Sequence, residues 1–171
     1  MVYVSEDRKA NGVILGLSVK ENISLSVLEK LSSVLGSIDM GKEENMAEDA
    51  IRNMSIKTSG TRQLVRNLSG GNQQKVSLSK SLMTKPKILI LDEPTRGVDV
   101  GAKKEIYEIM NQFKKDGMSI IMISSEIPEI LGMSDRILVM HEGRITGSLE
   151  HKEANQENIM RLAVGEKGVA L

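Results

Sequence analysis

The alternation of apolar and polar residues divides the chain into two parts of different character. Between residues 16 and 83, apolar positions recur every three or four residues, which predicts amphipathic helices. From residue 84 onward, short aliphatic runs alternate with helical segments, which predicts an α/β arrangement with a mostly parallel sheet. The pattern therefore indicates a helical unit that is joined to part of a sheet-containing core.

Two amphipathic helices are expected in the first half of the helical part. Ser18 and Glu21 have the spacing of a capping box, and apolar residues follow them at helical spacing. A loop is expected over residues 32–41, which contain two glycines and several small polar residues. A second helix is expected over residues 46–54, where apolar residues again recur with the helical period.

Aliphatic runs in the second part predict strands. Residues 88–91 and 119–123 are almost entirely aliphatic, which is typical of strands buried on both faces of a parallel sheet. Residues 137–140 are expected to form a third strand, and a turn leads from it into residues 144–148. Helices are expected between these strands, and a weaker one over residues 156–164 near the C-terminus.

Composition limits the classes of function. The chain has 23 basic and 23 acidic residues, so its net charge gives no reason to expect nucleic acid or an acidic membrane as a partner. It has no cysteine, which excludes a disulfide framework and a thiolate metal site. With one phenylalanine, two tyrosines and no tryptophan, it lacks the aromatic residues on which nucleobases stack.

The most informative local pattern is Ser69-Gly70-Gly71, which precedes a helix expected over residues 72–82. The first N–H groups of a helix have no intrahelical partners and carry partial positive charge, so this end can bind an anion such as phosphate. Glycine lets a ligand approach the backbone closely, and serine can either cap the helix or bind a ligand oxygen. An ordinary glycine-rich turn with a serine cap would produce the same pattern.

A second pattern places two carboxylates directly after the aliphatic run 88–91. The carboxyl ends of strands are where open α/β sheets bind ligands. Asp92 there can bind Mg²⁺, directly or through a water, and Glu93 on the other side of the strand end can polarise an attacking water. The alternative is an acidic pair that caps the next turn.

The order of these motifs along the chain, and the number of residues between them, resemble those of the nucleotide-binding domain of ABC ATPases. Residues 68–75, Leu-Ser-Gly-Gly-Asn-Gln-Gln-Lys, look like the signature motif of that family. Residues 88–93 look like its Walker B strand, and residues 96–99 look like its D-loop. The resemblance covers almost all of the chain.

Finer features resemble the second ATPase half of monosaccharide importers of the ribose, galactose, xylose and arabinose type. These features are Asn72, where most ABC proteins have glutamine, and the runs 3–9 and 92–104. The resemblance implies an ATPase component of such an importer, with ribose as one candidate sugar, bound peripherally at the cytoplasmic face of the membrane. It implies ATP and Mg²⁺ as ligands. The implied partners are a second ATPase half, transmembrane permease subunits and, indirectly, an extracytoplasmic sugar-binding protein.

The resemblance also implies roles for individual residues. In ABC dimers the signature motif of one half serves the nucleotide held by the phosphate loop of the other half. The residues implied in nucleotide binding are Ser69, Gly70, Gly71, Asn72, Gln73, Asp99 and Glu6. Asp92 is implied as the metal ligand, and Glu93 and Ser125 are implied as the catalytic residues.

Three features depart from the family pattern. Nowhere in the chain is Gly-Lys followed by Ser or Thr, so the phosphate-loop motif is absent. Glu6 occupies about the usual place of the Q-loop glutamine, and Ser125 occupies that of the switch histidine, whose charge a serine cannot carry. We therefore expect the chain alone to bind ATP poorly and not to hydrolyse it. We also expect self-association through the incomplete sheet, since an unpaired strand edge favours it.

The expected fold is α/β, part of a P-loop NTPase of the RecA-like, ABC type, with a mostly parallel sheet and an inserted helical subdomain. Residues 1–15 would form the Q-loop region, 16–83 the helical subdomain with the signature, 84–150 the core, and 151–171 a C-terminal tail helix. Two alternatives stay open: a non-catalytic docking module that supplies the signature motif in trans, and a non-transport ABC ATPase. Balanced charge and the absence of long heptads argue against the latter.

Overall fold

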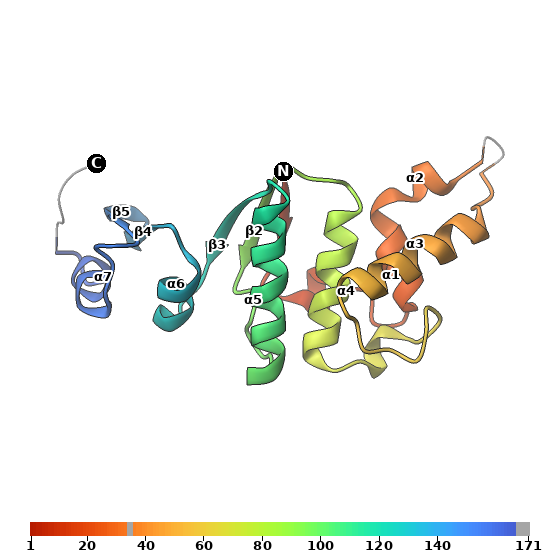
Figure 1. The fold of residues 1–171 in the computed structure, drawn as a ribbon, viewed down its shortest axis with the longest axis horizontal. Coiled ribbons are helices and arrows are strands. Elements are labelled where there is room, and N and C mark those ends of the chain that lie inside the picture. The colour runs from red at the N-terminus through yellow and green to blue at the C-terminus, as the bar shows by residue number, and fades with distance from the viewer. Residues whose placement is uncertain (34–35, 167–171) are drawn as a thin grey trace. The chain divides into compact units, whose positions relative to one another are not determined.

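The computed structural model describes residues 1–33 and 36–166, and the chain divides into two compact units after Ile123. Figure 1 shows the helices and strands of both units along the chain. Part of the expected loop 32–41 and the last residues of the expected tail lie outside the described residues. The units separate inside the expected 84–150 core, and the expected domain boundaries stay predictions.

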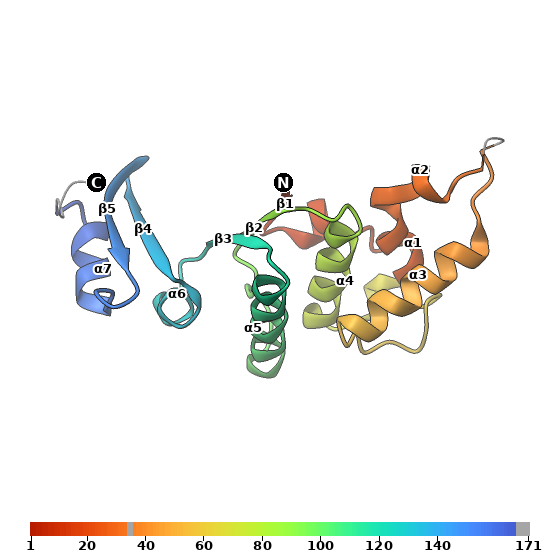
Figure 2. The same cartoon turned by 45° about the horizontal axis from the view of Figure 1, so that its top comes forward.

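The first unit contains a three-stranded parallel sheet in the order β1–β2–β3. Strand β1 is Val2–Val4, β2 is Ile88–Asp92 and β3 is Ser119–Ile123, so the strands expected at 88–91 and 119–123 are confirmed. Helix α5, Val100–Lys115, connects β2 to β3, as a parallel pair requires. Helices α4 and α5 lie on one side of the sheet (Figure 2).

The prediction that both faces of these strands are buried was wrong for the described residues. Leu89 and Leu91 are fully buried, whereas Ile121 is 51% exposed and Ile123 is 48% exposed. Neighbouring residues on a strand point to opposite faces, and only one face of this sheet is covered by helices. An unbroken aliphatic run does not reveal how many faces of a strand are covered.

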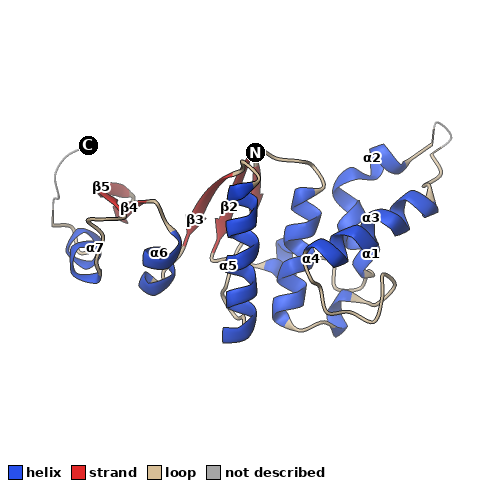
Figure 3. Cartoon of the chain, in the orientation of Figure 1, coloured by secondary structure: helices blue, strands red, loops and turns tan. Residues whose placement is uncertain are grey.

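The helical part contains α1, Val19–Ser24; α2, Leu28–Leu31; α3, Met40–Asn53; and α4, Gly70–Leu82 (Figure 3). The capping box is confirmed, because Ser18 Oγ accepts from the Glu21 N–H and the Glu21 carboxylate accepts from the Ser18 N–H.

The single helix expected after that box is interrupted by the 3₁₀ turn Leu25–Val27. Within this turn the Ser26 hydroxyl donates to the carbonyl of Lys80 at 2.6 Å, so a contact with α4 accompanies the break. A contact between segments so far apart does not change the local spacing of apolar residues, so the sequence pattern could not predict it.

Helix α3 begins before the apolar stripe that predicted it. Asp39 Oδ1 accepts from the N–H groups of Gly41 at 3.1 Å and Lys42 at 3.0 Å, which starts the helix at Met40. The expected loop therefore ends earlier than residue 41. The helix start was missed because its first turn is polar and contains a glycine.

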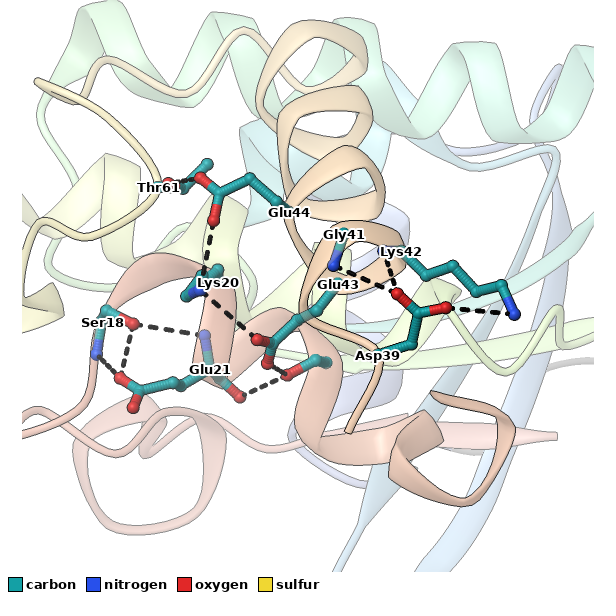
Figure 4. A network of polar contacts seen from close by, with 10 residues as sticks. Ser18, Lys20, Glu21, Asp39, Gly41, Lys42, Glu43, Glu44 and Thr61 are labelled. Atoms are coloured by element: carbon teal, nitrogen blue, oxygen red, sulfur yellow. Dashed lines mark hydrogen bonds and ion pairs between the residues drawn. The ribbon is translucent and has the colours of Figure 1, made fainter. Parts of the chain in front are cut away.

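A group of charges that is buried except for the partly exposed Glu44 joins α1 to α3 (Figure 4). The Lys20 ammonium lies 3.1 Å from the Glu44 carboxylate and 3.5 Å from that of Glu43. Glu43 also accepts from the Ser24 hydroxyl at 2.7 Å, and Glu44 accepts from the Thr61 hydroxyl. The hydrogen bond from Thr61, followed by that from Lys20, lowers the pKa of Glu44, and the bond to Glu44 raises the pKa of Lys20.

These shifts predict loss of stability at both ends of the pH scale. The folded-state pKa of Glu44 is below its ordinary 4.5, so its contribution is present above pH 4.5 and disappears on acidification. The pKa of Lys20 is above its ordinary 10.5, so its contribution disappears as the pH rises beyond 10.5. Thermal unfolding should therefore depend less steeply on pH in Lys20→Met/Glu44→Gln than in the wild type, in both ranges.

The matched control is Arg52→Met/Glu48→Gln, which removes an exposed ion pair from the same helix α3. Exposed pairs contribute little to stability, so this variant should keep the wild-type pH profile. Parallel profiles for the wild type and the Lys20 variant would contradict the prediction.

The second unit is a β-hairpin with two helices: α6, Ile127–Met133; β4, Arg136–His141; β5, Arg144–Glu150; and α7, Gln156–Ala163. These confirm the strands expected at 137–140 and 144–148 and the C-terminal helix. Strand β4 pairs with β5, antiparallel, and not with β3. A small core of Ile137, Val139, Ile159 and Leu162 packs α7 on the hairpin. Across residues 1–33 and 36–166, no helix has the length and apolar character that a membrane span needs.

Candidate nucleotide site

The first turn of α4 holds the Ser69-Gly70-Gly71 pattern. Ser69 stands at the N-cap position, but its side chain makes no capping hydrogen bond. Its hydroxyl oxygen instead accepts from the Asn72 amide at 2.9 Å, and the Asn72 carbonyl oxygen accepts from the Lys57 N–H at 2.8 Å. Asn72 therefore fixes the orientation of the exposed Ser69 hydroxyl, and the N–H groups of the first turn are left to another acceptor.

Both glycines of this turn stand in close contact with other segments. A Cβ on Gly71 would lie 2.5 Å from the Cβ of Ala102 on α5. A Cβ on Gly70 would lie 2.9 Å from Arg8 Nη2 and 3.0 Å from the carbonyl oxygen of Gly97. The two glycines thus let α4 pack closely against α5 and against the turn that precedes α5. They also leave the backbone accessible to a ligand.

Two further predicted residues are used inside the protein. Asp99 caps α5, because its Oδ1 accepts from the Ala102 N–H at 2.9 Å. Gln73 is buried, and its amide donates to the carbonyls of Val65 and Leu68, each at 3.2 Å. Both side chains stabilise the backbone beside the first turn of α4, and their expected contact with nucleotide stays a prediction.

Asp92 ends β2 at the carboxyl edge of the sheet, and Glu93 follows it directly. The Tyr3 hydroxyl on β1 donates to Asp92 Oδ2 at 2.5 Å, and this bond raises the pKa of Tyr3. Glu93 has φ 44, in the left-handed region, where a non-glycine residue stores roughly 1–3 kcal/mol of strain. Its N–H donates to the carbonyl of Ile123 at 2.8 Å, so the chain turns sharply at this carboxylate.

The donors at this edge suit Mg²⁺, which binds oxygen ligands and commonly takes one or two carboxylates together with phosphates and water. In residues 1–33 and 36–166 there is no group of three or more His, Cys, Asp or Glu side chains able to hold a metal. Asp92 would therefore supply a carboxylate, and the nucleotide and water would supply the remaining ligands. When bound, the ion would neutralise charge on the phosphates.

Glu6 and Arg8 flank the turn that precedes α5. Glu6 forms an ion pair with Arg96, and the Arg8 guanidinium donates to the carbonyls of Arg96 and Gly97. The structure thus brings Glu6, Gly70 and the 96–99 turn to one place. Asp92 and Glu93 lie at the strand end of the same unit, and the exposed Ser125 belongs to the second unit.

The sequence analysis assigned no role to three residues that contact these motifs: Tyr3, Arg8 and Lys57. Tyr3 and Arg8 lie within the run 3–9, which the sequence marked only as a feature of a subtype. Their partners lie 88 or 89 residues away along the chain. Only an alignment of related sequences could have indicated such contacts in advance.

Solved structures share this fold. The dimeric, post-hydrolysis structure of the ATP-binding cassette MJ0796 bound to ADP and Pi matches with a TM-score of 0.72 and 20% identity, over 87% of this chain and 62% of that chain. A second dimeric structure of MJ0796, a bacterial ABC transporter cassette, matches with a TM-score of 0.72, 19% identity and the same coverage. An inward-facing structure of a metal-chelate type ABC transporter matches with a TM-score of 0.74 and 13% identity, over 88% of this chain and 59% of that chain.

The chain thus spans about three fifths of the length of these structures, and its fold is that of an α/β ABC ATPase. The sequence model of the ABC transporter family matches residues 1–96, which is more than half of the chain. The match includes the signature residues, β2 and both strand-end carboxylates. The chain therefore belongs to the ABC transporter family.

Proposed function

We propose that the chain is an ATP-binding component of an ABC-type importer of monosaccharides, with ribose as one candidate sugar. The first turn of α4 carries this proposal, because the Ser69 hydroxyl is held by Asn72 beside two glycines. The ADP and Pi in one MJ0796 structure support a nucleotide as the ligand. The sugar rests on the resemblance of residues 3–9 and 92–104 to monosaccharide importers.

Each site residue has a role in this proposal. Ser69 and the N–H groups of Gly70 and Gly71 bind the γ-phosphate of ATP held by a partner ATPase half. Asp92 holds Mg²⁺, and Glu93 polarises the attacking water on the nucleotide of this chain's own half. Ser125, in the place of the switch histidine, contacts a phosphate oxygen.

The partners follow from the same proposal. Dimeric cassettes and a transporter among the structural neighbours support a second ATPase half and transmembrane permease subunits as partners. The chain would then bind peripherally at the cytoplasmic face of the membrane. A sugar-binding protein outside the membrane would act indirectly, through the permease.

The test is turnover in trans. The chain is mixed with a partner cassette that has an intact phosphate loop and an inactivated signature serine, and ATP hydrolysis is measured. The wild-type chain should stimulate turnover, and Ser69→Arg should lower it by about 10²-fold or more, because a phosphate-binding group is lost and a bulky one enters. Ser69 is exposed, so thermal unfolding of the chain should not change.

Asn67→Arg is the matched control, because it places the same side chain at an exposed position two residues earlier. It should leave turnover and stability unchanged. Equal turnover with wild-type and Ser69→Arg chains would refute the proposal, and unfolding of Ser69→Arg would assign Ser69 to the fold.

A second candidate is a non-catalytic docking module that supplies the signature motif in trans. The oriented Ser69 hydroxyl at the first turn of α4 favours it, because this is the group that such a module would offer to a nucleotide held by a partner. Under this alternative the chain alone neither binds ATP tightly nor hydrolyses it. Steady hydrolysis by the chain alone that disappears in Glu93→Gln would exclude it.

A further inference from the structure

We propose that Arg8 is a positioning residue that holds the turn at residues 96–99 against the first turn of α4. The consequence for turnover rests on the proposed function, which assigns that first turn to phosphate. The contact itself is a feature of the first unit. It links the segment after β1 to two motifs that lie far away along the chain.

The guanidinium of Arg8 makes two hydrogen bonds to one turn. Nη1 donates to the carbonyl oxygen of Arg96 at 2.9 Å, and Nη2 donates to that of Gly97 at 3.3 Å. A planar guanidinium can reach two neighbouring acceptors at once, whereas the ammonium of a lysine acts as a single point charge. The turn is therefore held at two adjacent peptide units.

The base of this side chain is fixed as well. Arg8 starts the short π-helical turn Arg8–Gly12, which is capped by Asp7. Asp7 Oδ1 accepts from the N–H groups of Lys9 at 3.1 Å and Ala10 at 3.0 Å. Arg8 thus extends from a capped turn and not from a free loop.

The same guanidinium lies against α4. Nη2 is 2.9 Å from the place where a Cβ on Gly70 would stand, and the Gly97 carbonyl oxygen is 3.0 Å from that place. Arg8 Nε is buried without a hydrogen-bond partner in the part of the chain that the structure describes. A buried, unpaired donor costs free energy, which the two hydrogen bonds of the same guanidinium offset, and the short distances around Gly70 show that the two turns pack closely.

This packing explains what Arg8 does for the site. Without its guanidinium, the carbonyls of Arg96 and Gly97 would lose their donors beside the turn that is proposed to bind phosphate. The 96–99 turn would then move relative to Gly70, and the first N–H groups of α4 with it. A displacement of about 1 Å is enough to lower a reaction rate about 10²-fold. In the proposed function the partner half holds most of the nucleotide, so turnover should change more than the Michaelis constant.

The first experiment measures amide hydrogen exchange in the chain alone, which does not depend on the proposed function. Arg8→Lys should raise exchange at Gln73, Arg96 and Val98, whose N–H groups donate to backbone carbonyls in the two turns, while the unfolding midpoint stays near that of the wild type. Arg8→Gln, which keeps a donor group, is a second variant should the lysine variant fold poorly. Lys9→Ala removes a neighbouring exposed charge and should exchange like the wild type. Unchanged exchange at the three amides in both Arg8 variants would overturn the inference.

The second experiment measures ATP turnover in trans with the same variants. Arg8→Lys should lower kcat about 10-fold or more and leave KM within about 2-fold, because positions change more than binding contacts. Raised exchange with unchanged kcat would overturn the positioning role. If the wild-type chain itself gives no turnover, the proposed function fails, and the exchange experiment alone decides whether Arg8 holds the turn.

Discussion

Gly71→Ala should lower the free energy of unfolding of the chain by about 2 kcal/mol, as measured by urea denaturation. The new Cβ would stand 2.5 Å from the Cβ of Ala102 and 3.5 Å from Val98 Cγ1, and neither atom lies at the end of a flexible side chain. Alanine normally improves a helix over glycine by about 1 kcal/mol, so the observed loss would be the clash minus this gain.

A compensating change makes this prediction specific. Gly71→Ala/Ala102→Gly moves the methyl group from one helix to the other, and it should recover most of the lost stability. Gly41→Ala is the matched control, because Gly41 lies in the first turn of α3 with nothing closer than 3.5 Å to its added Cβ. A Gly71 variant as stable as the Gly41 variant would show that the two helices separate easily.

The elements that the sequence predicted correctly are those that local chemistry determines. The capping box at Ser18 and Glu21 closes within four residues, and it forms as expected. The strand at 88–91 and the hairpin near 141–144 follow from aliphatic runs and turn residues, and both are present. The motif order, with its separations, was enough to predict the ABC ATPase fold.

Coverage of the sheet and interruption of a helix were beyond sequence reasoning, because both depend on distant segments. The two faces of β3 differ in exposure only because helices cover one of them. The break at Leu25–Val27 accompanies a hydrogen bond from Ser26 to α4, more than fifty residues away along the chain. Neither contact changes the hydrophobic period that the prediction used.

The candidate site shows the same difference between features that the local sequence determines and features that distant segments determine. Residue types at the motifs were read from the sequence, and Ser69, Gly70 and Glu93 lie at a helix start and a strand end as expected. The groups that fix them, such as Lys57 behind Asn72 and Tyr3 beside Asp92, come from other elements. Motifs therefore indicate which groups to expect at the candidate site, and the tertiary structure indicates what orients them.

Glu105→Ala should lower the free energy of unfolding by about 3 kcal/mol, because it leaves a buried charge almost unpaired. The side chain of Lys75 on α4 is 1% exposed, and its ammonium donates to Glu105 Oε2 at 2.6 Å and to the carbonyl of Ser55 at 2.9 Å. Glu105 on α5 is 37% exposed and also pairs with Lys57 at 3.1 Å. The stability is therefore lost because the buried ammonium of Lys75 would keep a single neutral acceptor, the Ser55 carbonyl.

Removing both partners tests this explanation. Lys75→Met/Glu105→Ala should be more stable than Glu105→Ala, because an apolar side chain of similar length has no charge to desolvate. Glu108→Ala is the matched control on the same helix, with an exposed carboxylate, and should change stability by less than about 0.5 kcal/mol. If this explanation is right, the double variant has a higher free energy of unfolding than Glu105→Ala. If both lose the same stability, the effect comes from lost packing between α4 and α5 and not from the buried ammonium.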